Sequence, residues 1–382
     1  MYDRILDTPA SSVFLFGPRG TGKTTFVRQR LPNARSYDLL DSETFLRLSQ
    51  APQRLYDECR LLACGSWVVI DEVQRIPTLL NEVHRLIEGE GLRFVLTGSS
   101  ARKLRRGGVN LLAGRALGKA MFPLVSSELG EDANMMQMLR FGSLPSVVGH
   151  VKPMDYLHSY TSTYLAQEVQ QEALTRNLGA FSRFLEVAAR QNAQQTNMLN
   201  IAREAGVKRS TVAHYFEILE DMLLGNFLPA WKLKSRTRQV KASKFYFFDC
   251  GVTRSLSGRL PYPPSQEELG PLLEALVVNE LRAYISYQNL YYPLHYWSSY
   301  SGSKVDVLLE TQDGHVAIEI KASHRWDRKF HRALKSVAED LGRSSTATYG
   351  VYMGAQQVLV DDVRVLPVQD FLKALWRGEL IR

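Results

Sequence analysis

The strongest constraint on the fold is a glycine-rich octapeptide, residues 17–24, which separates a short apolar run from a helical segment. It matches the pattern G-x-x-x-x-G-K-S/T, in which backbone N–H groups at the start of a helix surround phosphate groups. Apolar runs at residues 12–16, 66–70 and 92–97 alternate with helical segments. Continuous apolar strands separated by helices predict a parallel sheet that is covered on both faces.

The octapeptide and the residue after it are the predicted ATP-binding residues: Gly17, Pro18, Arg19, Gly20, Thr21, Gly22, Lys23, Thr24 and Thr25. The glycines allow backbone N–H groups to close around the phosphates, and Lys23 adds a positive charge beside the β and γ phosphates. The Thr24 hydroxyl is expected to bind Mg²⁺. The loop therefore predicts a site for ATP with magnesium.

Two carboxylates follow the second apolar run. Asp71 and Glu72 come at the carboxyl end of a predicted strand, where open α/β sheets bind their ligands. Asp71 is expected to hold Mg²⁺ through water, and Glu72 to orient and deprotonate the attacking water. One of Thr97 and Ser99 is predicted to contact the γ-phosphate or to fix that water. Ordinary turn chemistry is the alternative reading of these two side chains.

An arginine usually meets the charge that develops on a transferred phosphoryl group, and a neighbouring subunit often supplies it. Arg115, in the sequence LAGR at residues 112–115, is the first candidate. The reserve candidates are Arg102, Arg105 and Arg106. Any of these four side chains could instead be an ordinary surface arginine.

Four segments resemble those of bacterial and archaeal AAA+ ATPases whose C-terminal half is a domain of unknown function, family number 4143. They are GPRGTGKT at residues 17–24, IDEVQ at 70–74, LTGSS at 96–100 and LAGR at 112–115. The resemblance covers nearly the whole chain, and it continues through KFYFFDCG at 244–251 and IEIKAS at 318–323. It implies a ring-like homo-oligomer, often a hexamer, with ATP bound between subunits.

Length and composition restrict the class of protein. A chain of 382 residues fits two or three domains, and its net charge of +8 favours a polyanionic partner. No apolar run approaches the roughly 20 residues of a membrane span, and the start lacks the apolar stretch of a secretory signal. We therefore expect a cytoplasmic protein without a membrane partner. The three cysteines include no CxxC pair, which favours packed thiols over a zinc site or disulfides.

Residues 200–215 have the spacing of a helix-turn-helix. Ala202 and Ala205 are small enough for two helices to cross closely, and Gly206 allows the turn between them. We predict a winged-helix shape, with the segment 231–248 in the place of the wing. The predicted DNA-binding residues are Lys208, Arg209, Ser210, Thr211, Lys232, Lys234, Arg236 and Arg238. A helical pair that only packs the core is the alternative.

Cations gather in two stretches of the sequence. One holds six cations in thirteen residues with no acid among them: Lys232, Lys234, Arg236, Arg238, Lys241 and Lys244. The other is formed by His324, Arg325, Arg328, Lys329, Arg332 and Lys335. Because both stretches flank predicted DNA-binding elements, we interpret them as nucleic-acid contacts. Two solvated faces are the alternative.

A second chemical site is predicted near the C-terminus. Residues 305–309 and 316–321 form two strands joined at Asp313-Gly314, a strong hairpin signal. Glu319 and Lys321 are two residues apart, so both point to one face of their strand. Asp306 lies on the partner strand within reach of that face. Two carboxylates beside a lysine predict a Mg²⁺ site that can activate water.

This pattern resembles the PD-(D/E)XK nuclease fold, which includes junction resolvases and restriction enzymes. The resemblance implies a catalytic trio of Asp306, Glu319 and Lys321, with the two carboxylates as metal ligands. A further acid is expected from the preceding helix, which we predict to start at Pro271: Glu274, or failing that Glu280. An ordinary ion pair on an inactive fold is the alternative, and Lys304 stands where related sequences commonly carry an acid.

The sequence thus predicts an α/β protein in three parts. These are an AAA+ ATPase domain at residues 1–132, a helical and winged-helix-like domain at 133–243, and a PD-(D/E)XK nuclease-like domain at 244–382. The predicted function is an ATP-dependent enzyme that binds and remodels DNA, branched DNA above all, and cuts it if the second site is active. The alternative is an ATP-dependent switch or DNA-binding regulator with an inactive nuclease-like domain. A small-molecule kinase would explain neither the Asp71–Glu72 pair nor the C-terminal half.

Overall fold

The computed structural model describes residues 2–100, 112, 114–164, 177–232, 242–299 and 302–381. The chain forms two compact units. The first comprises Met1–Pro123 with Leu219–Leu224, and the second comprises Leu124–Ile218 with Gly225–Arg382. Among the described residues, no helix is both long enough and apolar enough to cross a membrane.

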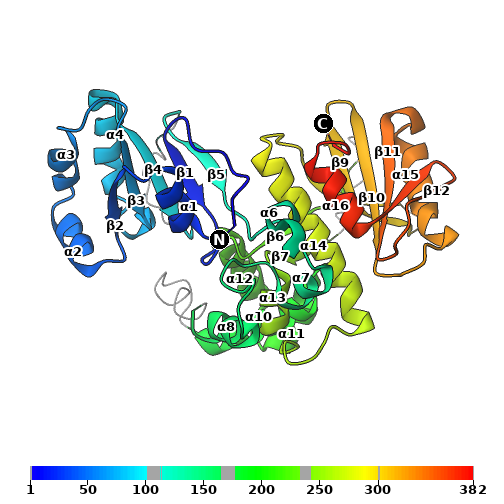
Figure 1. Ribbon diagram of the computed structural model, residues 1–382. Helices are drawn as coiled ribbons and strands as arrows, with labels where there is room; N and C mark the ends of the chain where they lie inside the picture. Colours follow the sequence, from blue (N-terminus) through cyan, green and yellow to red (C-terminus); the bar gives the residue numbers. More distant parts are fainter. Residues whose placement is uncertain are drawn as a thin grey trace. The chain divides into compact units, whose positions relative to one another are not determined.

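The first unit is built on a five-stranded parallel sheet with the strand order β2-β3-β4-β1-β5 (Figure 1). Its strands are β1 (Val13–Phe16), β2 (Arg35–Asp38), β3 (Trp67–Asp71), β4 (Arg93–Gly98) and β5 (Leu117–Ala120). Its helices are α1 (Lys23–Arg30), α2 (Ser42–Gln50), α3 (Arg54–Cys59) and α4 (Leu79–Glu90), with a 3₁₀ turn η1 (Val73–Arg75). The predicted parallel sheet is confirmed.

Alternate strand residues explain why this sheet is covered on both faces. Phe14, Ile70 and Leu96 belong to one apolar cluster with Leu48 of α2 and residues of α3 and α4. Leu15, the neighbour of Phe14, points to the opposite face and is also buried, at 1% exposure. Strands that are apolar at every position can therefore only sit between two helical layers.

The second unit begins with a helical region. Its helices are α6 (Ser126–Leu129), α7 (Met135–Phe141), α8 (Pro153–Ser159), α10 (Leu178–Arg190), α11 (Met198–Ala205), α12 (Arg209–Asp221) and α13 (Cys250–Leu256), with short turns η2 (Gly130–Asp132) and η3 (Tyr160–Tyr164). Between α12 and α13, the strands β6 (Gly225–Leu228) and β7 (Lys244–Phe247) pair antiparallel. Helices α11 and α12 are joined at Gly206, whose φ of 67° is a left-handed conformation that glycine adopts without strain.

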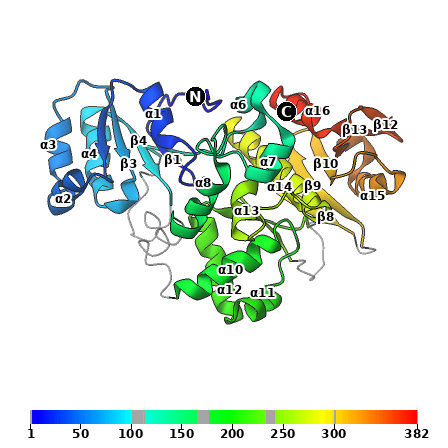
Figure 2. The same cartoon turned by 60° about the horizontal axis from the view of Figure 1, so that its bottom comes forward.

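The second unit also contains a six-stranded mixed sheet in the order β12-β13-β11-β10-β9-β8. Its strands are β8 (Leu294–Ser298), β9 (Lys304–Thr311), β10 (Gly314–Lys321), β11 (Thr346–Tyr352), β12 (Val358–Val360) and β13 (Val363–Pro367). Its helices are α14 (Gln266–Tyr287), α15 (Arg332–Leu341) and α16 (Val368–Trp376), with turns η4 (Arg328–His331) and η5 (Arg343–Ser345). The helices α14 and α16 lie on one side of the sheet and α15 on the other (Figure 2). The hairpin of β9 and β10 is antiparallel, as predicted.

The expected start of α14 at Pro271 is wrong, because the helix begins five residues earlier. Ser265 is its N-cap and forms a capping box with Glu268, so Pro271 lies inside the helix. The capping box satisfies the first backbone N–H groups of the helix, and this signal outweighs the preference of proline for the first position. The earlier start gives α14 a length of 22 residues.

The motif FDCG at residues 248–251 has a structural role in joining α7 to α13. Asp249 caps α13 by accepting from Val252 N and also accepts from Ser143 N at 2.8 Å. A Cβ atom on Gly251 would lie 2.0 Å from the carbonyl oxygen of Phe141, so only glycine fits this contact. Burial raises the pKa of Asp249 to about 6.

Candidate functional site

The glycine loop connects β1 to α1, as the sequence predicts. The side chain of Lys23 is held inside the loop, where Nζ donates to the carbonyl oxygens of Gly17 at 2.7 Å and Pro18 at 3.1 Å. Gly20 and Gly22 have φ values of 81° and 89°, in the left-handed region that favours glycine. The loop therefore has the backbone shape of a phosphate-binding turn, with its lysine resting on backbone carbonyls.

The magnesium ligands predicted from sequence lie side by side. The Thr24 hydroxyl donates to Asp71 Oδ2 at 2.7 Å, and the Thr97 hydroxyl donates to Asp71 Oδ1. A hydroxyl and a carboxylate at this separation fit one Mg²⁺ ion, which takes oxygen ligands and retains several waters. The donor set around the loop thus fits ATP with magnesium.

Glu72 is held in a specific orientation by uncharged groups. Its φ of 58° is left-handed, which is unusual for glutamate, and its N–H donates to the Thr97 hydroxyl at 3.1 Å. Gln74 Nε2 and the Ser99 hydroxyl both donate to Glu72 Oε2, the latter at 3.2 Å. The sequence left open whether Thr97 or Ser99 belongs to the site. Both do, because Thr97 contacts Asp71 and Ser99 contacts Glu72.

Sequence reasoning missed Gln74 and Arg4. Gln74 is 3% exposed and bridges Glu72 to Ser99, and its position two residues after Glu72 was the only signal. Arg4 is also buried and donates to the carbonyl oxygens of Thr21 at 2.9 Å and Phe122 at 2.6 Å. It thus ties the glycine loop to the segment that follows β5. Nothing in the local sequence of Arg4 indicates this role.

The predicted phosphoryl-contacting arginines are only partly described. Arg115 forms an ion pair with Glu88 of α4, and its side chain is 38% exposed. The reserve candidates Arg102, Arg105 and Arg106 lie outside the described residues. The role of Arg115 toward a neighbouring subunit stays a prediction.

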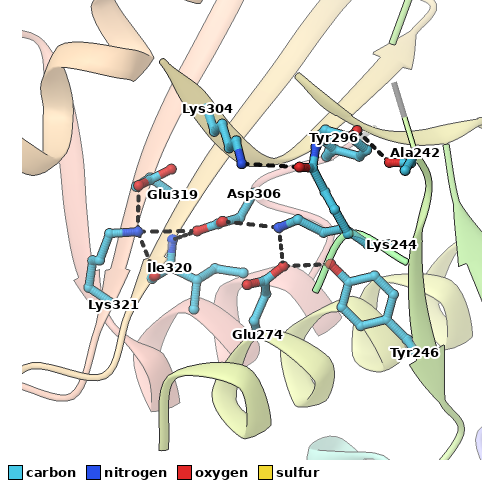
Figure 3. Close-up of polar contacts among 11 residues, drawn as sticks. Ala242, Lys244, Tyr246, Glu274, Tyr296, Lys304, Asp306, Glu319, Ile320 and Lys321 are labelled. Atoms are coloured by element: carbon cyan, nitrogen blue, oxygen red, sulfur yellow. Dashed lines mark hydrogen bonds and ion pairs between the residues drawn. The ribbon is translucent and has the colours of Figure 1, made fainter. Parts of the chain in front are cut away.

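A cluster of five charged side chains, which we call the carboxylate–lysine cluster, lies in the second unit (Figure 3). It consists of Lys244, Glu274, Asp306, Glu319 and Lys321, which come from β7, α14, β9 and β10. The β9–β10 register pairs Val307 with Ile318, which brings the three residues predicted as a catalytic trio together. The side chains of Lys244 and Glu319 are 9% and 8% exposed. The predicted trio is therefore adjacent, and α14 adds a third carboxylate.

The two lysines lie between the carboxylates. Lys244 Nζ is 2.6 Å from Glu274 Oε1 and 3.4 Å from Asp306 Oδ1. Lys321 Nζ is 2.5 Å from Glu319 Oε1 and 3.3 Å from Asp306 Oδ2. Each ammonium group is thus shared by two carboxylates, with Asp306 in the middle (Figure 3).

Other polar groups complete the cluster. Ile320 N donates to Asp306 Oδ2 at 2.9 Å, and the Tyr246 hydroxyl donates to Glu274 Oε1 at 2.5 Å. Glu319 Oε2, by contrast, is buried and accepts no hydrogen bond from any described residue. The cluster therefore contains one carboxylate oxygen more than its donors satisfy.

Burial and mutual charge shift the pKa values of the cluster. Burial, followed by the charge of Asp306, raises the pKa of Glu274 to about 7 and that of Glu319 to about 8. Burial alone would raise the pKa of Asp306 too, but the ammonium groups of Lys321 and Lys244 outweigh it and lower this pKa. Burial would lower the pKa of Lys244, but Glu274 and Asp306 raise it above its ordinary value.

Of the two acids proposed from α14, Glu274 joins the cluster and Glu280 does not. Glu280 accepts from Ser126 N at 2.7 Å and from Trp376 Nε1 at 2.6 Å, and so joins α14 to α6 and α16. Burial raises its pKa to about 7. One helix therefore carries a partly buried glutamate, Glu274, and a buried one, Glu280, with different partners, which their spacing in the sequence does not reveal.

As arranged, the cluster does not fit a divalent cation. In the part of the chain that the structure describes, no group of three or more His, Cys, Asp or Glu side chains is placed to hold a metal ion. The physical reason is that Lys244 Nζ lies between the oxygens of Glu274 and Asp306. Lys244, which the sequence places in a stretch interpreted as nucleic-acid contacts, is buried in this cluster.

The predicted DNA-binding residues are partly described. Lys208, Arg209 and Ser210 are exposed at the start of α12, whereas Ala205 and Val212 are fully buried between helices. The second basic stretch is exposed for most of its length, at His324, Arg325, Arg328, Lys329 and Arg332. Thr211 is half-buried, and Lys232 is exposed. The remaining predicted residues Lys234, Arg236 and Arg238, with Lys241, lie outside the described residues.

Three family models match successive parts of the chain. Residues 10–130 match the AAA domain, residues 132–262 the domain of unknown function DUF8612, and residues 269–371 the domain of unknown function DUF4143. The chain carries an AAA-type ATPase domain. This confirms the predicted ATPase domain and the predicted C-terminal family, whereas the match of the middle region was not anticipated. The nuclease resemblance stays a prediction. No curated protein matches the chain.

Similarity to solved structures is distant. A signal-transduction ATPase with numerous domains from Pyrococcus horikoshii is 17% identical, with a TM-score of 0.23, and the match covers 73% of this chain and 46% of that one. The chain thus spans less than half the length of that protein. The DNA clamp loader delta protein of Bacillus subtilis is 12% identical, with a TM-score of 0.25 and coverages of 54% and 82%. Can2 from Sulfobacillus thermosulfidooxidans, in complex with cyclic tetra-adenylate, is 11% identical, with a TM-score of 0.24 and coverages of 97% and 97%. At such low TM-scores, these structures carry no weight for the function of the chain.

Proposed function

We propose that the chain is an ATP-driven protein that binds and remodels DNA. The AAA domain supplies ATP binding and hydrolysis. The observation that carries the DNA part is the exposed start of α12, where Lys208, Arg209 and Ser210 follow a glycine turn against the packed helix α11. A helix with this placement is the element that helix-turn-helix proteins insert into the major groove.

In the first unit, each residue of the site has a separate task. When ATP binds, Lys23 exchanges the carbonyl oxygens of Gly17 and Pro18 for phosphate oxygens. Thr24 and Asp71 would hold magnesium, which would neutralise charge on the phosphates when bound. Glu72 accepts a proton from the attacking water. Because Gln74 and Ser99 hold the Glu72 carboxylate, its orientation does not depend on the nucleotide.

Charge supports a nucleic-acid partner. The chain has a net charge of +8, and exposed cations lie on α12 and on the turn before α15. Such cations bind phosphates in a salt-dependent manner because binding releases counterions. A preference for branched DNA and a ring of subunits with Arg115 at the neighbouring site are parts of the same proposal, and they rest on the resemblance to AAA+ ATPases.

The test compares ATP turnover with forked, four-way and linear DNA, together with DNA binding at low salt. We expect DNA to stimulate hydrolysis, and a Lys208→Ala, Arg209→Ala double variant to lose most of that stimulation while its basal rate is unchanged. Lys152→Ala is the control, because Lys152 is an exposed lysine of the same unit at the start of α8 and is not part of α12. An ATPase rate that no DNA alters, with no DNA binding, would reject the proposal. Size measurement with and without ATP tests ring formation.

A second candidate function is favoured by the position of Lys244. An ammonium group between Glu274 and Asp306 is expected of a domain that does not cut DNA. Such a domain would instead bind DNA or another partner under the control of ATP. This switch or regulator predicts no Mg²⁺-dependent nicking by the wild-type protein. Nicking that disappears in Asp306→Ala and Lys321→Ala, while ATPase activity is retained, would exclude it.

A further inference from the structure

The disagreement between the carboxylate–lysine cluster and a metal site is itself informative. Three carboxylates and two ammonium groups lie within one buried network, and one oxygen of Glu319 is left without a described partner. Carboxylates in this number suit a divalent cation in an otherwise apolar interior. The cluster differs from such a metal site because Lys244 lies between two of its carboxylates.

We propose that Lys244 takes the place of a divalent cation in this cluster, so that its ammonium group, rather than a metal ion, joins Glu274 to Asp306. The proposal concerns the second unit alone and does not depend on the ATP-driven function. It makes Lys244 the residue that decides whether the cluster holds a metal.

Lys244 leaves no space for a divalent cation between Glu274 and Asp306. A Mg²⁺ or Ca²⁺ ion lies about 2.0–2.6 Å from its carboxylate oxygens. Lys244 Nζ is 2.6 Å from Glu274 Oε1 and 3.4 Å from Asp306 Oδ1, so it occupies the region in which an ion shared by these two oxygens would have to lie. A metal ion cannot enter there unless the lysine side chain leaves.

Lys244 is held in place by contacts of both its backbone and its side chain. Its backbone is paired to Leu228 in the β6–β7 ladder, and its ammonium group lies over the Tyr296 ring, 5.6 Å from the ring centre. That ring is fixed in turn, because the Tyr296 hydroxyl donates to Ala242 O at 2.7 Å and accepts from Gln195 at 2.9 Å. A buried cation that leaves its two carboxylates and an aromatic ring loses its compensating partners, so displacement is costly.

The charge of the two lysines also weakens the attraction of the cluster for a divalent cation. In the wild type, two ammonium groups offset the three carboxylates, which leaves little net attraction for a further 2+ ion. Removing Lys244 leaves Lys321 as the remaining cluster cation. It frees Asp306 Oδ1 in addition to Glu319 Oε2 and leaves Glu274 Oε1 with only the neutral Tyr246 hydroxyl. A Lys244→Met variant keeps a side chain of similar length but loses the positive charge. It should therefore create the divalent-cation site that Lys244 blocks in the wild type.

The experiment measures Mn²⁺ binding to nucleotide-free, chelator-treated protein by calorimetry, for the wild type, Lys244→Met, Lys304→Met, and Lys244→Met combined with Asp306→Asn. Lys304 is the matched control because it lies on β9 near Asp306 but contacts the neutral amide of Gln195 at 3.3 Å. We expect Lys244→Met to bind one Mn²⁺ at least ten-fold more tightly than the wild type, Lys304→Met to match the wild type, and the double variant to lose the gained site. Any ion held near Asp71 contributes equally to all four proteins.

Two results would overturn the proposal. One is a wild-type protein whose Mn²⁺ binding depends on Asp306 and is as tight as that of Lys244→Met. The other is a folded Lys244→Met variant that binds no better than the wild type. If this variant does not fold, amine labelling of the wild type with peptide mass spectrometry decides instead, with Lys304 as the reactive reference. Lys244 should stay protected when millimolar Mn²⁺ is added, and exposure of Lys244 by Mn²⁺ would contradict its role as the resident cation.

Discussion

The glycine loop of the first unit and the carboxylate–lysine cluster of the second use the same kinds of side chain in opposite ways. In the first, Asp71 and Glu72 are held by hydroxyl and amide groups, and Lys23 donates to backbone carbonyls. In the second, each lysine is held by two carboxylates. Neutral partners orient a charged group and leave its net charge in place, whereas a partner of opposite charge offsets that charge. The comparison shows that partner type, more than residue type, separates a site ready for a charged ligand from a closed ion network.

The largest expected effect of this difference is on stability. Asp306→Ala leaves the buried ammonium group of Lys244 and the partly buried one of Lys321 without their shared partner, and should lower the free energy of unfolding by about 3–5 kcal/mol. Asp71→Ala leaves only hydroxyl groups unpaired and should cost about 1–3 kcal/mol. Urea unfolding measures both, with tryptophan fluorescence reporting mainly on the second unit. Asp340→Ala, at an exposed position of α15, is the control. Equal losses for Asp306→Ala and Asp71→Ala would break the comparison.

The next effect is on catalysis. Glu72→Gln removes the proposed base and should lower the kcat of ATP hydrolysis by roughly 10²–10⁴-fold, with nucleotide affinity nearly unchanged. Glu319→Gln, the same substitution in the other unit, should leave basal hydrolysis unaltered, because that carboxylate is engaged by Lys321. Steady-state turnover and nucleotide binding by fluorescence measure the two variants. Loss of basal hydrolysis in Glu319→Gln would contradict the separation of the two sites.

A smaller effect is expected from the neutral groups that hold Glu72. Gln74→Leu and Ser99→Ala should each reduce kcat by about ten-fold, because a misoriented base loses part of its contribution. The affinity for ATP should change little. The double variant should lose less than the product of the single effects, since both groups act on the same oxygen, Glu72 Oε2. Strict multiplication of the two effects would instead indicate separate tasks.

The smallest effect concerns Glu280, the α14 glutamate that contacts Ser126 and Trp376 instead of joining the carboxylate–lysine cluster. Burial raises the pKa of Glu280 to about 7, so the folded state keeps a proton that the unfolded chain loses near its ordinary value of 4.5. Stability therefore falls as pH rises between these values, by at most roughly 1.4 kcal/mol per pH unit for this group. Glu280→Gln removes that titration and should give a shallower decline in urea midpoints from pH 5 to 7. A slope identical to the wild type would show that Glu280 does not titrate there.

Much of the first unit could be predicted because its signals are local. The helical segment expected after the glycine loop is α1, and β1, β3 and β4 match their apolar runs within one residue. A phosphate-binding loop is encoded by glycines at fixed spacing, so its shape depends little on distant contacts. The roles of Gln74 and Arg4 were not predictable, because each depends on a contact that the tertiary structure creates.

The second unit shows the limits more clearly. The hairpin and the Glu319–Lys321 face followed from alternation along one strand. Pro271 predicts a later start for α14 than the structure shows, because the capping box at Ser265 starts the helix before the proline. Lys244 was read as one of a run of cations, although alternation along β7 places it on the same side as Tyr246, and both contact Glu274.

The sequence by itself determined the parallel sheet, the glycine loop and the positions of Asp71, Asp306 and Glu319 on their strands. These depend on spacing within short segments, and backbone geometry translates such spacing directly into structure. Only the tertiary structure decided which side chains meet across β7, α14 and β9. The net effect of a buried charge depends on the partners around it, and those partners come from different segments, up to 62 residues apart for Lys244 and Asp306.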